Sequence, residues 1–378
     1  MNILINTAST FKGGGVQVAK SFIEECRRFP EHEYHVVLGE SLDKMIGRND
    51  FPPNFHFYAI GYRPATKVFS FQSADVFFKA LEKKVQPDVV FTTSGPSYWK
   101  PIAPHLEGFN LPHYIYADSP FFSGISMWKN IRWKLKGMVI RYFYKKDADA
   151  LVVQTEDVNE RVSHWTGKSR VYTVTNTYGA QYDLSSETDK KILPPLQEGE
   201  QRFLMLSAYY AHKNFEIINR VCEILEQEKM TRFRFVVTLP AEIFAGLFSA
   251  KAKKYIHNTG PLKPDECPAL YRQCDFVFLP TLLECFSATY AEGMKMGKPI
   301  LTSNLSFAHT VCGDAAIYFD PLNADDVIAK MHKLAGNHDL QENLVKKGKD
   351  RLSSLLTSEQ RARRYIEICK ELAESIKQ

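Results

Sequence analysis

Two glutamates eight positions apart stand in the segment TLLECFSATYAEGMKMG, residues 281–297, directly after the apolar run FVFLP. Glu284 falls in the loop after this expected strand, and Glu292 falls a turn or more inside the helix that follows. A carboxylate repels a phosphate, so both glutamates can serve one site only by accepting hydrogen bonds from sugar hydroxyls. A phosphate can then be bound by backbone N–H groups at the expected helix start, those of Phe286, Ser287 and Ala288. The alternative is a pair of solvated glutamates on a surface helix.

Two further loops carry groups that suit an anion. In SAYYAHKN, Lys213 places an ammonium where it could reach a diphosphate and act as a fixed charge in place of a metal. In TASTFKGGGV, the glycines Gly13, Gly14 and Gly15 permit close backbone approach to an anion, although the loop matches neither the dinucleotide fingerprint nor the Walker sequence. A solvated lysine and a plain tight turn are the alternatives.

The elements that must position these residues alternate between short β-branched or aromatic runs and longer amphipathic segments. This alternation predicts βαβ units and a parallel sheet in each half of the chain. The expected strands are residues 3–6, 35–38, 89–92, 114–116 and 151–154 in the first half, and 203–206, 233–237, 276–279, 300–302 and 316–319 in the second. Ligands of open parallel sheets bind beyond the carboxyl ends of the strands, so a site is expected in the loops described above.

The polar stretch 186–200 shows neither helical nor strand periodicity and contains two adjacent prolines, which predicts a linker. It separates an N-terminal lobe, residues 1–185, from a C-terminal lobe, residues 201–357. The last segment, 358–378, begins with a capping-box pattern and carries one apolar stripe. We therefore expect a C-terminal helix that crosses back to pack on the first lobe.

Composition and charge exclude several classes of protein. The 378 residues are 44% hydrophobic and 24% charged, which is globular usage and not that of a disordered or fibrous chain. The net charge of +5 is too small to predict a nucleic-acid partner. The seven cysteines lack metal-ligand spacing, and no apolar run is long enough to span a membrane. We expect a reduced, cytoplasmic protein.

The segment from Pro280 to Pro321 resembles the signature region of glycosyltransferase family 4, whose members are retaining, nucleotide-sugar-dependent enzymes. Its most specific part is the motif of Glu284, seven residues and Glu292. Further matches are the glycine loop, VYTVTNTYG around Asn176, and the HKN segment that begins at His212, so the resemblance covers most of the chain. It implies the α/β GT-B fold, with two Rossmann-like, doubly wound parallel-sheet lobes that face each other across a cleft.

The resemblance also implies a role for each matching residue. Glu292 would bind the ribose of the nucleotide, and Glu284 would lie against the donor sugar. The diphosphate would be held by the side chain of Lys213, by the backbone at Phe286 and Ser287, and by Gly14 and Gly15 of the first lobe. Base contacts are expected from the backbone near Gly260 and Leu262.

Two positions depart from the family pattern. Ala208 stands where many members have an arginine, so Lys213 would hold the diphosphate charge with less help. In HYIYADSP, Ala117 stands where many have a histidine, which leaves Asp118 and Ser119 beside the site. Catalysis, which consists mainly of stabilising the leaving diphosphate and orienting the acceptor, is then expected to rest on Lys213, Glu284 and Asp118.

The leading hypothesis is a retaining transferase of the hexosyl type. It would move a sugar from a nucleotide diphosphate to a hydroxyl of a glycan or polyprenyl-linked acceptor, as in the synthesis of cell-surface polysaccharides. A nucleotide-sugar epimerase and a non-catalytic partner subunit on the same fold are the alternatives, whereas a nicotinamide-dependent dehydrogenase lacks its glycine fingerprint. No cofactor and no divalent metal are expected, since the metal-motif-like residues 147–149 directly precede a strand.

Two features of the first lobe suit an acceptor. Tyr98 and Trp99 could stack on acceptor sugar rings or could be core aromatics. The segment 126–146 combines basic residues and two tryptophans with an apolar helical face. It predicts either an ordinary packed helix with a solvated basic face or a helix that docks on the anionic inner face of the membrane.

Overall fold

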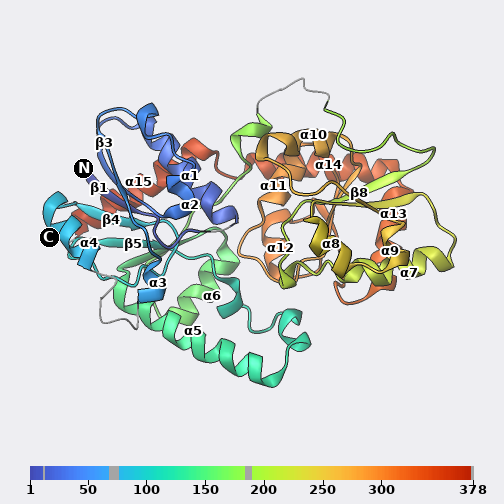
Figure 1. The fold of residues 1–378 in the computed structure, drawn as a ribbon, viewed down its shortest axis with the longest axis horizontal. Coiled ribbons are helices and arrows are strands. Elements are labelled where there is room, and N and C mark those ends of the chain that lie inside the picture. Colours follow the sequence, from blue (N-terminus) through green and yellow to red (C-terminus); the bar gives the residue numbers. More distant parts are fainter. Residues whose placement is uncertain (12, 68–75, 184–189, 376–378) are drawn as a thin grey trace. The chain divides into compact units, whose positions relative to one another are not determined.

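The computed structural model describes residues 1–11, 13–67, 76–183 and 190–375, which form two compact α/β units (Figure 1). Unit 1 comprises residues 1–117, 125–176 and 356–378, and unit 2 comprises residues 118–124 and 177–355. Each unit is built around a parallel sheet with its own apolar core. The predicted pair of doubly wound lobes is therefore confirmed.

Unit 1 contains a seven-stranded sheet of order β3-β2-β1-β4-β5-β6-β7, in which all neighbouring strands are parallel. The strands are β1 (Asn2–Asn6), β2 (Glu33–Leu38), β3 (Phe55–Ala59), β4 (Val89–Thr92), β5 (His105–Gly108), β6 (Ala150–Val153) and β7 (Val171–Thr173). Strands β4 and β6 are buried along their whole length because helices cover both faces of the sheet. The order reverses between β1 and β4, so the loops after these strands lie at a switch point.

The helices of unit 1 are α1 (Gly14–Glu25), α2 (Glu40–Asp43), α3 (Pro64–Lys67), α4 (Val76–Val85), α5 (Met127–Asp147), α6 (Glu156–Thr166) and α15 (Ser358–Ser375). As predicted, the C-terminal helix α15 packs on this unit, beside α1 and β4. Tyr365 of α15 meets Phe22 of α1 and Phe91 of β4, with ring centroids 5.4 and 5.1 Å away. Three segments far apart in sequence therefore share one aromatic cluster.

Unit 2 contains a six-stranded parallel sheet of order β10-β9-β8-β11-β12-β13. Its strands are β8 (Gln201–Met205), β9 (Phe233–Val237), β10 (Ile256–Asn258), β11 (Phe276–Leu279), β12 (Ile300–Ser303) and β13 (Ala316–Phe319). Its helices are α7 (Ile217–Gln227), α8 (Ala241–Leu247), α9 (Ala250–Lys253), α10 (Cys267–Arg272), α11 (Ala288–Lys295), α12 (Ser306–Cys312), α13 (Ala324–Ala335) and α14 (His338–Ser353). Here the strand order reverses between β8 and β11.

One expected strand is wrong. Residues 114–116 are not extended; a 3-10 turn, Pro112–Tyr114, occupies this region. The strand of this part of the sheet is β5, whose polar sequence HLEG hides it from a search for apolar runs. Its burial is possible because His105 hydrogen-bonds the Thr92 hydroxyl and the Asp147 carbonyl, both at 2.8 Å.

The expected linker is only partly a linker. Residues 184–189 lie outside the described part of the chain, but 190–200 belongs to unit 2. The side-chain oxygen of Gln273 accepts hydrogen bonds from the N–H groups of Ile192 and Leu193, both at 3.0 Å. The boundary between the units lies earlier than predicted, after Asn176, so residues 177–183 belong to unit 2 and not to the N-terminal lobe.

Candidate active site

The two loops that carry the predicted charged residues follow neighbouring strands of unit 2. Strands β8 and β11 pair in parallel, with Phe203 opposite Phe276. The loop after β8 leads to a 3-10 turn, Ala211–Lys213, and the loop after β11 leads to helix α11. Because parallel strands end at the same edge of a sheet, both loops begin at the switch point of this sheet.

Lys213 and Glu284 meet between these loops. The ammonium of Lys213 forms an ion pair with Glu284 Oε1, and the Thr281 hydroxyl donates to the same oxygen at 3.2 Å. The two side chains are only 12% and 11% exposed. A charge pair in such a setting is weakly screened by solvent. The structure thus brings together two residues that the sequence assigned to the same site without predicting their contact.

Asn214 holds the lysine loop in place. It adopts the left-handed conformation with φ 58° and ψ 43°, which asparagine tolerates better than most residues. Its side-chain amide donates to the carbonyls of Pro280, at 3.1 Å, and Pro321, at 2.8 Å. The loops after β8, β11 and β13 are therefore joined at one side chain. The motif match included Asn214, but chemical reasoning from residue types overlooked it.

Replacing Asn214 by alanine is expected to lower the free energy of unfolding by about 2–4 kcal/mol, because two buried carbonyls lose their donor. Asn214→Gly also removes the amide, but glycine adopts the left-handed backbone without strain. Its free energy of unfolding should therefore fall less than that of Asn214→Ala, by the amount that backbone strain contributes. Urea unfolding followed by far-ultraviolet circular dichroism measures both variants. A loss below about 0.5 kcal/mol in Asn214→Ala would contradict the anchoring role.

Glu292 lies inside α11 and is held by two tyrosines that the sequence did not suggest. The Tyr271 hydroxyl donates to Glu292 Oε2 at 3.0 Å, and Tyr182 forms a second side-chain hydrogen bond to this carboxylate. Burial raises the pKa of Glu292, while the two hydrogen bonds and the charge of Lys213 act to lower it. Glu292 is thus positioned as a hydrogen-bond acceptor that ionises later than an ordinary glutamate as pH rises.

Tyr271→Phe removes one hydrogen bond that favours the carboxylate, so the pKa of Glu292 should rise further. If the carboxylate is the form that accepts hydrogen bonds from a ligand, ligand affinity grows with pH as Glu292 ionises. The midpoint of this rise in affinity should then lie at higher pH in Tyr271→Phe than in the unaltered chain. Titration calorimetry with a nucleoside diphosphate across the pH range measures it.

The matched control is Tyr290→Phe, since the Tyr290 hydroxyl bonds Thr302 at 2.9 Å and not Glu292. Its pH profile should follow that of the unaltered chain. In Glu292→Gln, the affinity for the nucleoside diphosphate should no longer rise with pH. Identical midpoints in Tyr271→Phe and the unaltered chain would refute the coupling.

The remaining predicted donor residues of unit 2 lie at strand or helix ends. Helix α11 begins at Ala288, with Ser287 as its N-cap and Phe286 before it. The first turn of a helix leaves N–H groups without intrahelical partners, so these residues can present donors to an anion. Gly260, with φ 73°, stands two residues after the end of β10, and Leu262 comes two residues later. Their contact with a nucleotide stays a prediction.

Residues 118–124 pack with unit 2, although the sequence placed them in the first lobe. The Ser119 hydroxyl donates to the Leu282 carbonyl at 2.6 Å and is almost fully buried. The ring of Phe121 lies 6.5 Å from that of His212, whose pKa burial and the neighbouring Lys213 lower to about 4. Ser119 therefore supports the Glu284 loop and is not an exposed acceptor contact. Asp118 is exposed beside it.

The two aromatic residues proposed for the acceptor differ in their placement in unit 1. Trp99 is 1% exposed and stacks on Phe78 with centroids 4.8 Å apart, so it is a core residue and the stacking prediction is wrong for it. Tyr98 is partly buried against Phe143, at 4.8 Å. It has φ 58°, and its acceptor role stays a prediction.

The glycine loop forms the turn between β1 and α1 of unit 1. Gly13, at the N-cap of α1, has φ 66° and ψ −154°, a conformation that only glycine adopts readily. A side chain at Gly15 would come within 3.2 Å of the Asn110 amide, whereas Gly14 has open space. Backbone geometry therefore favours glycine at position 13 and close packing favours it at position 15, whereas neither reason applies to Gly14. A contact with the donor diphosphate stays a prediction.

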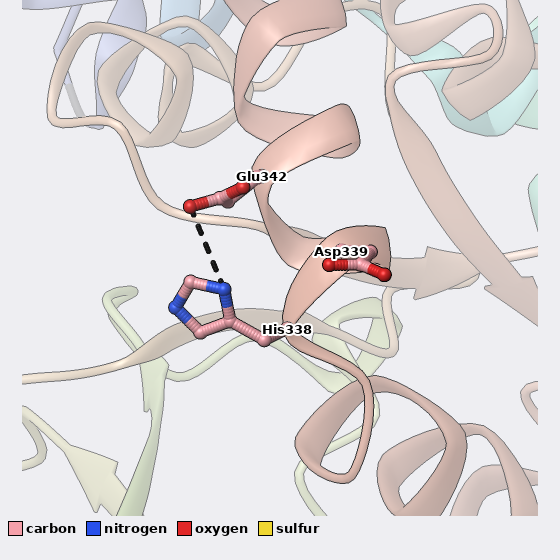
Figure 2. A group of neighbouring side chains, drawn as sticks. All are labelled: His338, Asp339 and Glu342. Atoms are coloured by element: carbon pink, nitrogen blue, oxygen red, sulfur yellow. Dashed lines mark ion pairs between the residues drawn. The ribbon is translucent and has the colours of Figure 1, made fainter.

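One group of metal-ligand type occurs in the described part of the chain, and it lies away from the loops above. His338, Asp339 and Glu342 are all exposed at the start of α14, where His338 Nδ1 lies 3.5 Å from Glu342 Oε1 (Figure 2). Exposed acidic clusters of this kind are common on helix surfaces. In the motif-like residues 147–149, Asp149 pairs with Lys100 at 2.5 Å and accepts from the His105 N–H at 2.9 Å, which is a structural role.

In a comparison with protein families, residues 186–351 match the family described as glycosyl transferases group 1. The segment that matches this family, named the group 1 domain from here on, contains Lys213, Glu284 and Glu292, together with the loops that hold them. The match covers the whole sheet of unit 2.

The chain is also similar in sequence to two mannosyltransferases. The chain is 24% identical over 198 residues to the serotype-specific mannosyltransferase WbdA of Escherichia coli, which covers 49% of this chain and 24% of the relative. It is 23% identical over 245 residues to the O-antigen chain mannosyltransferase B of Escherichia coli, 60% of this chain and 63% of that protein. The chain thus spans about a quarter of the length of the first relative.

Among solved structures, the sucrose-phosphate synthase of Thermosynechococcus elongatus superposes with a TM-score of 0.74 at 12% identity, covering 99% of this chain and 100% of that one. Anabaena HepE in complex with UDP-glucose superposes with a TM-score of 0.68 at 11% identity, covering 100% and 99%. At such identities the likeness establishes the fold alone. The fold is GT-B, with two parallel-sheet units.

Proposed function

We propose that the chain is a retaining glycosyltransferase that moves a hexosyl group from a nucleotide-diphosphate sugar to a hydroxyl of a glycan or lipid-linked acceptor. The observation that carries the proposal is the meeting of Lys213 and Glu284 at the switch point of the group 1 domain, with Glu292 on the helix that follows. This arrangement provides one cation for a diphosphate and two carboxylates for hydroxyl groups.

The chemistry follows from these charges. When the bond between the anomeric carbon and the diphosphate breaks, negative charge develops on the leaving phosphate oxygen, where the Lys213 ammonium and the first N–H groups of α11 can stabilise it. Glu284 neutralises Lys213 in the structure, so an arriving diphosphate must compete with Glu284 for the ammonium. The freed carboxylate can then accept hydrogen bonds from the donor sugar.

Relatives named as mannosyltransferases make mannose the first sugar to test, and the UDP-glucose complex of HepE makes UDP-glucose the second. The O-antigen relative supports an acceptor of the cell-surface polysaccharide type. A thermal-shift panel of UDP-, GDP- and ADP-linked sugars is expected to raise Tm for one donor. A flat panel would count against the donor site.

The site residues offer a lysine where other enzymes use a metal, so we propose that transfer needs no divalent ion. Activity measured as release of the nucleotide should survive treatment with EDTA. Loss of activity in EDTA with recovery on addition of manganese would contradict this part of the proposal.

A further inference from the structure

Helix α5 presents a broad apolar face to solvent. Figure 1 shows it along the edge of unit 1. Its buried residues are Gly137, Ile140, Tyr144 and Asp147. Its exposed large apolar residues are Met127, Trp128, Ile131, Leu135, Met138, Val139 and Tyr142. At about 100° per residue, these seven fall within an arc of about 120° that faces away from the buried residues.

The exposure of this face is high for apolar side chains. Trp128 is 76% exposed, Met127 69% and Met138 59%. An ordinary packed helix turns its apolar stripe inward, whereas α5 uses a narrow stripe that contains a glycine and an aspartate for packing. Contiguous exposed apolar surface marks an interaction site.

The borders of the apolar face are basic. Seven basic residues are exposed on α5: Lys129, Arg132, Lys134, Lys136, Arg141, Lys145 and Lys146. On a helical wheel, Arg132 and Lys136 border one side of the apolar arc, and Lys134 and Arg141 border the other. The segment from 126 to 146 contains no acidic residue. Among the described residues, Lys146 alone of the seven has a carboxylate within ion-pair distance, Asp147 at 3.7 Å.

We propose that α5 docks flat on an anionic lipid bilayer, with its apolar arc at the boundary between headgroups and acyl chains and its basic borders on the lipid phosphates. An in-plane amphipathic helix combines these two features. A second copy of the chain fits this face poorly, because a twofold contact would bring two sets of basic borders together. None of the described helices has both the length and the apolar character needed to cross a bilayer. The inference goes beyond the proposed function and does not depend on it.

The test is co-sedimentation of the full chain with vesicles of phosphatidylglycerol and phosphatidylcholine in about equal parts, compared with vesicles of phosphatidylcholine alone. The unaltered chain should bind the anionic vesicles and bind them less at about 1 M salt than at about 0.1 M. Arg132→Glu/Lys136→Glu/Arg141→Glu should lower partitioning by at least about 100-fold, at roughly fivefold for each lost charge. Leu135→Asp/Met138→Asp should lower it as well, since the inserted face is then charged.

The matched control reverses three exposed lysines of unit 2: Lys333→Glu/Lys346→Glu/Lys349→Glu. It has the same net charge as the first triple variant and should bind as the unaltered chain does. Three results would overturn the proposal: equal binding to both kinds of vesicle, equal loss in both triple variants, or no vesicle binding together with a dimer in light scattering that Leu135→Asp/Met138→Asp dissociates. Circular dichroism checks that each variant is folded, and no readout involves sugar transfer.

Discussion

Replacing Lys213 by alanine is expected to lower the rate of sugar transfer by about 10²–10³-fold, because the leaving diphosphate loses the cation that stabilises it. Ala208 already stands where an arginine would assist, and the pKa of His212, lowered to about 4 by burial and Lys213, keeps that ring neutral, so no second cation of this loop can take over the role. The affinity for a nucleoside diphosphate should fall in parallel. Steady-state kinetics with the donor found in the thermal-shift panel, together with calorimetry on the free diphosphate, measures both effects.

The alanine variant also leaves Glu284 without its cation in a nearly buried position. Lys213→Ala/Glu284→Gln removes that complication, and it should fold as well as the unaltered chain yet remain inactive. Lys251→Ala is the matched control, because Lys251 is an exposed lysine of unit 2 that pairs with Glu226 at 3.4 Å. Full turnover in Lys213→Ala would exclude this lysine from catalysis.

Replacing Arg361 by alanine is expected to lower the free energy of unfolding of unit 1 by about 3 kcal/mol. Arg361 belongs to α15 and is 2% exposed. Its guanidinium donates to the Ser21 hydroxyl at 2.8 Å and to the side-chain oxygen of Asn176. Alanine would leave the Asn176 oxygen without this donor and open a cavity under the C-terminal helix. This pairing gives Asn176, which carried part of the family resemblance, a structural role.

Tryptophan fluorescence suits this measurement, because the four tryptophans, Trp99, Trp128, Trp133 and Trp165, all lie in unit 1. Arg361→Met keeps much of the side-chain volume without the charge and should recover part of the loss. Lys370→Ala, an exposed site on the same helix, should change stability by no more than about 0.5 kcal/mol. If Arg361→Ala behaves like Lys370→Ala, the guanidinium is not an anchor.

Most of the fold could be predicted from local patterns. Strands β4, β9, β11 and β13 were expected with the bounds that the structure shows, because short apolar runs between breakers are read directly from the chain. Strand β5 could not be found in this way. Its His105 and Glu107 are fully buried, and burial is tolerable only through partners elsewhere, such as the Ser97 N–H, which donates to Glu107 at 2.7 Å.

The predictions for the acceptor side also failed where burial depends on distant parts of the chain. Trp99 and Tyr98 are neighbours in sequence, but Trp99 is in the core and Tyr98 lies near the surface. Ser119 was assigned to the first lobe from its position in the chain, yet it bonds Leu282 in unit 2. Residue type alone does not show which side of a turn a side chain takes, because that depends on the packing around it.

The sequence by itself determined the two parallel-sheet lobes and the returning helix, because periodicity within short segments displays them directly. Its assignment of Lys213, Glu284 and Glu292 to one donor site rests on residue types and on the family resemblance, and it stays a prediction. Only the tertiary structure decided that Lys213 pairs with Glu284 across 71 residues of sequence, that Tyr271 and Tyr182 hold Glu292, and that α5 keeps its apolar face in solvent. Such contacts depend on which strands become neighbours in a sheet and which helix face is covered, and both are settled by the fold as a whole.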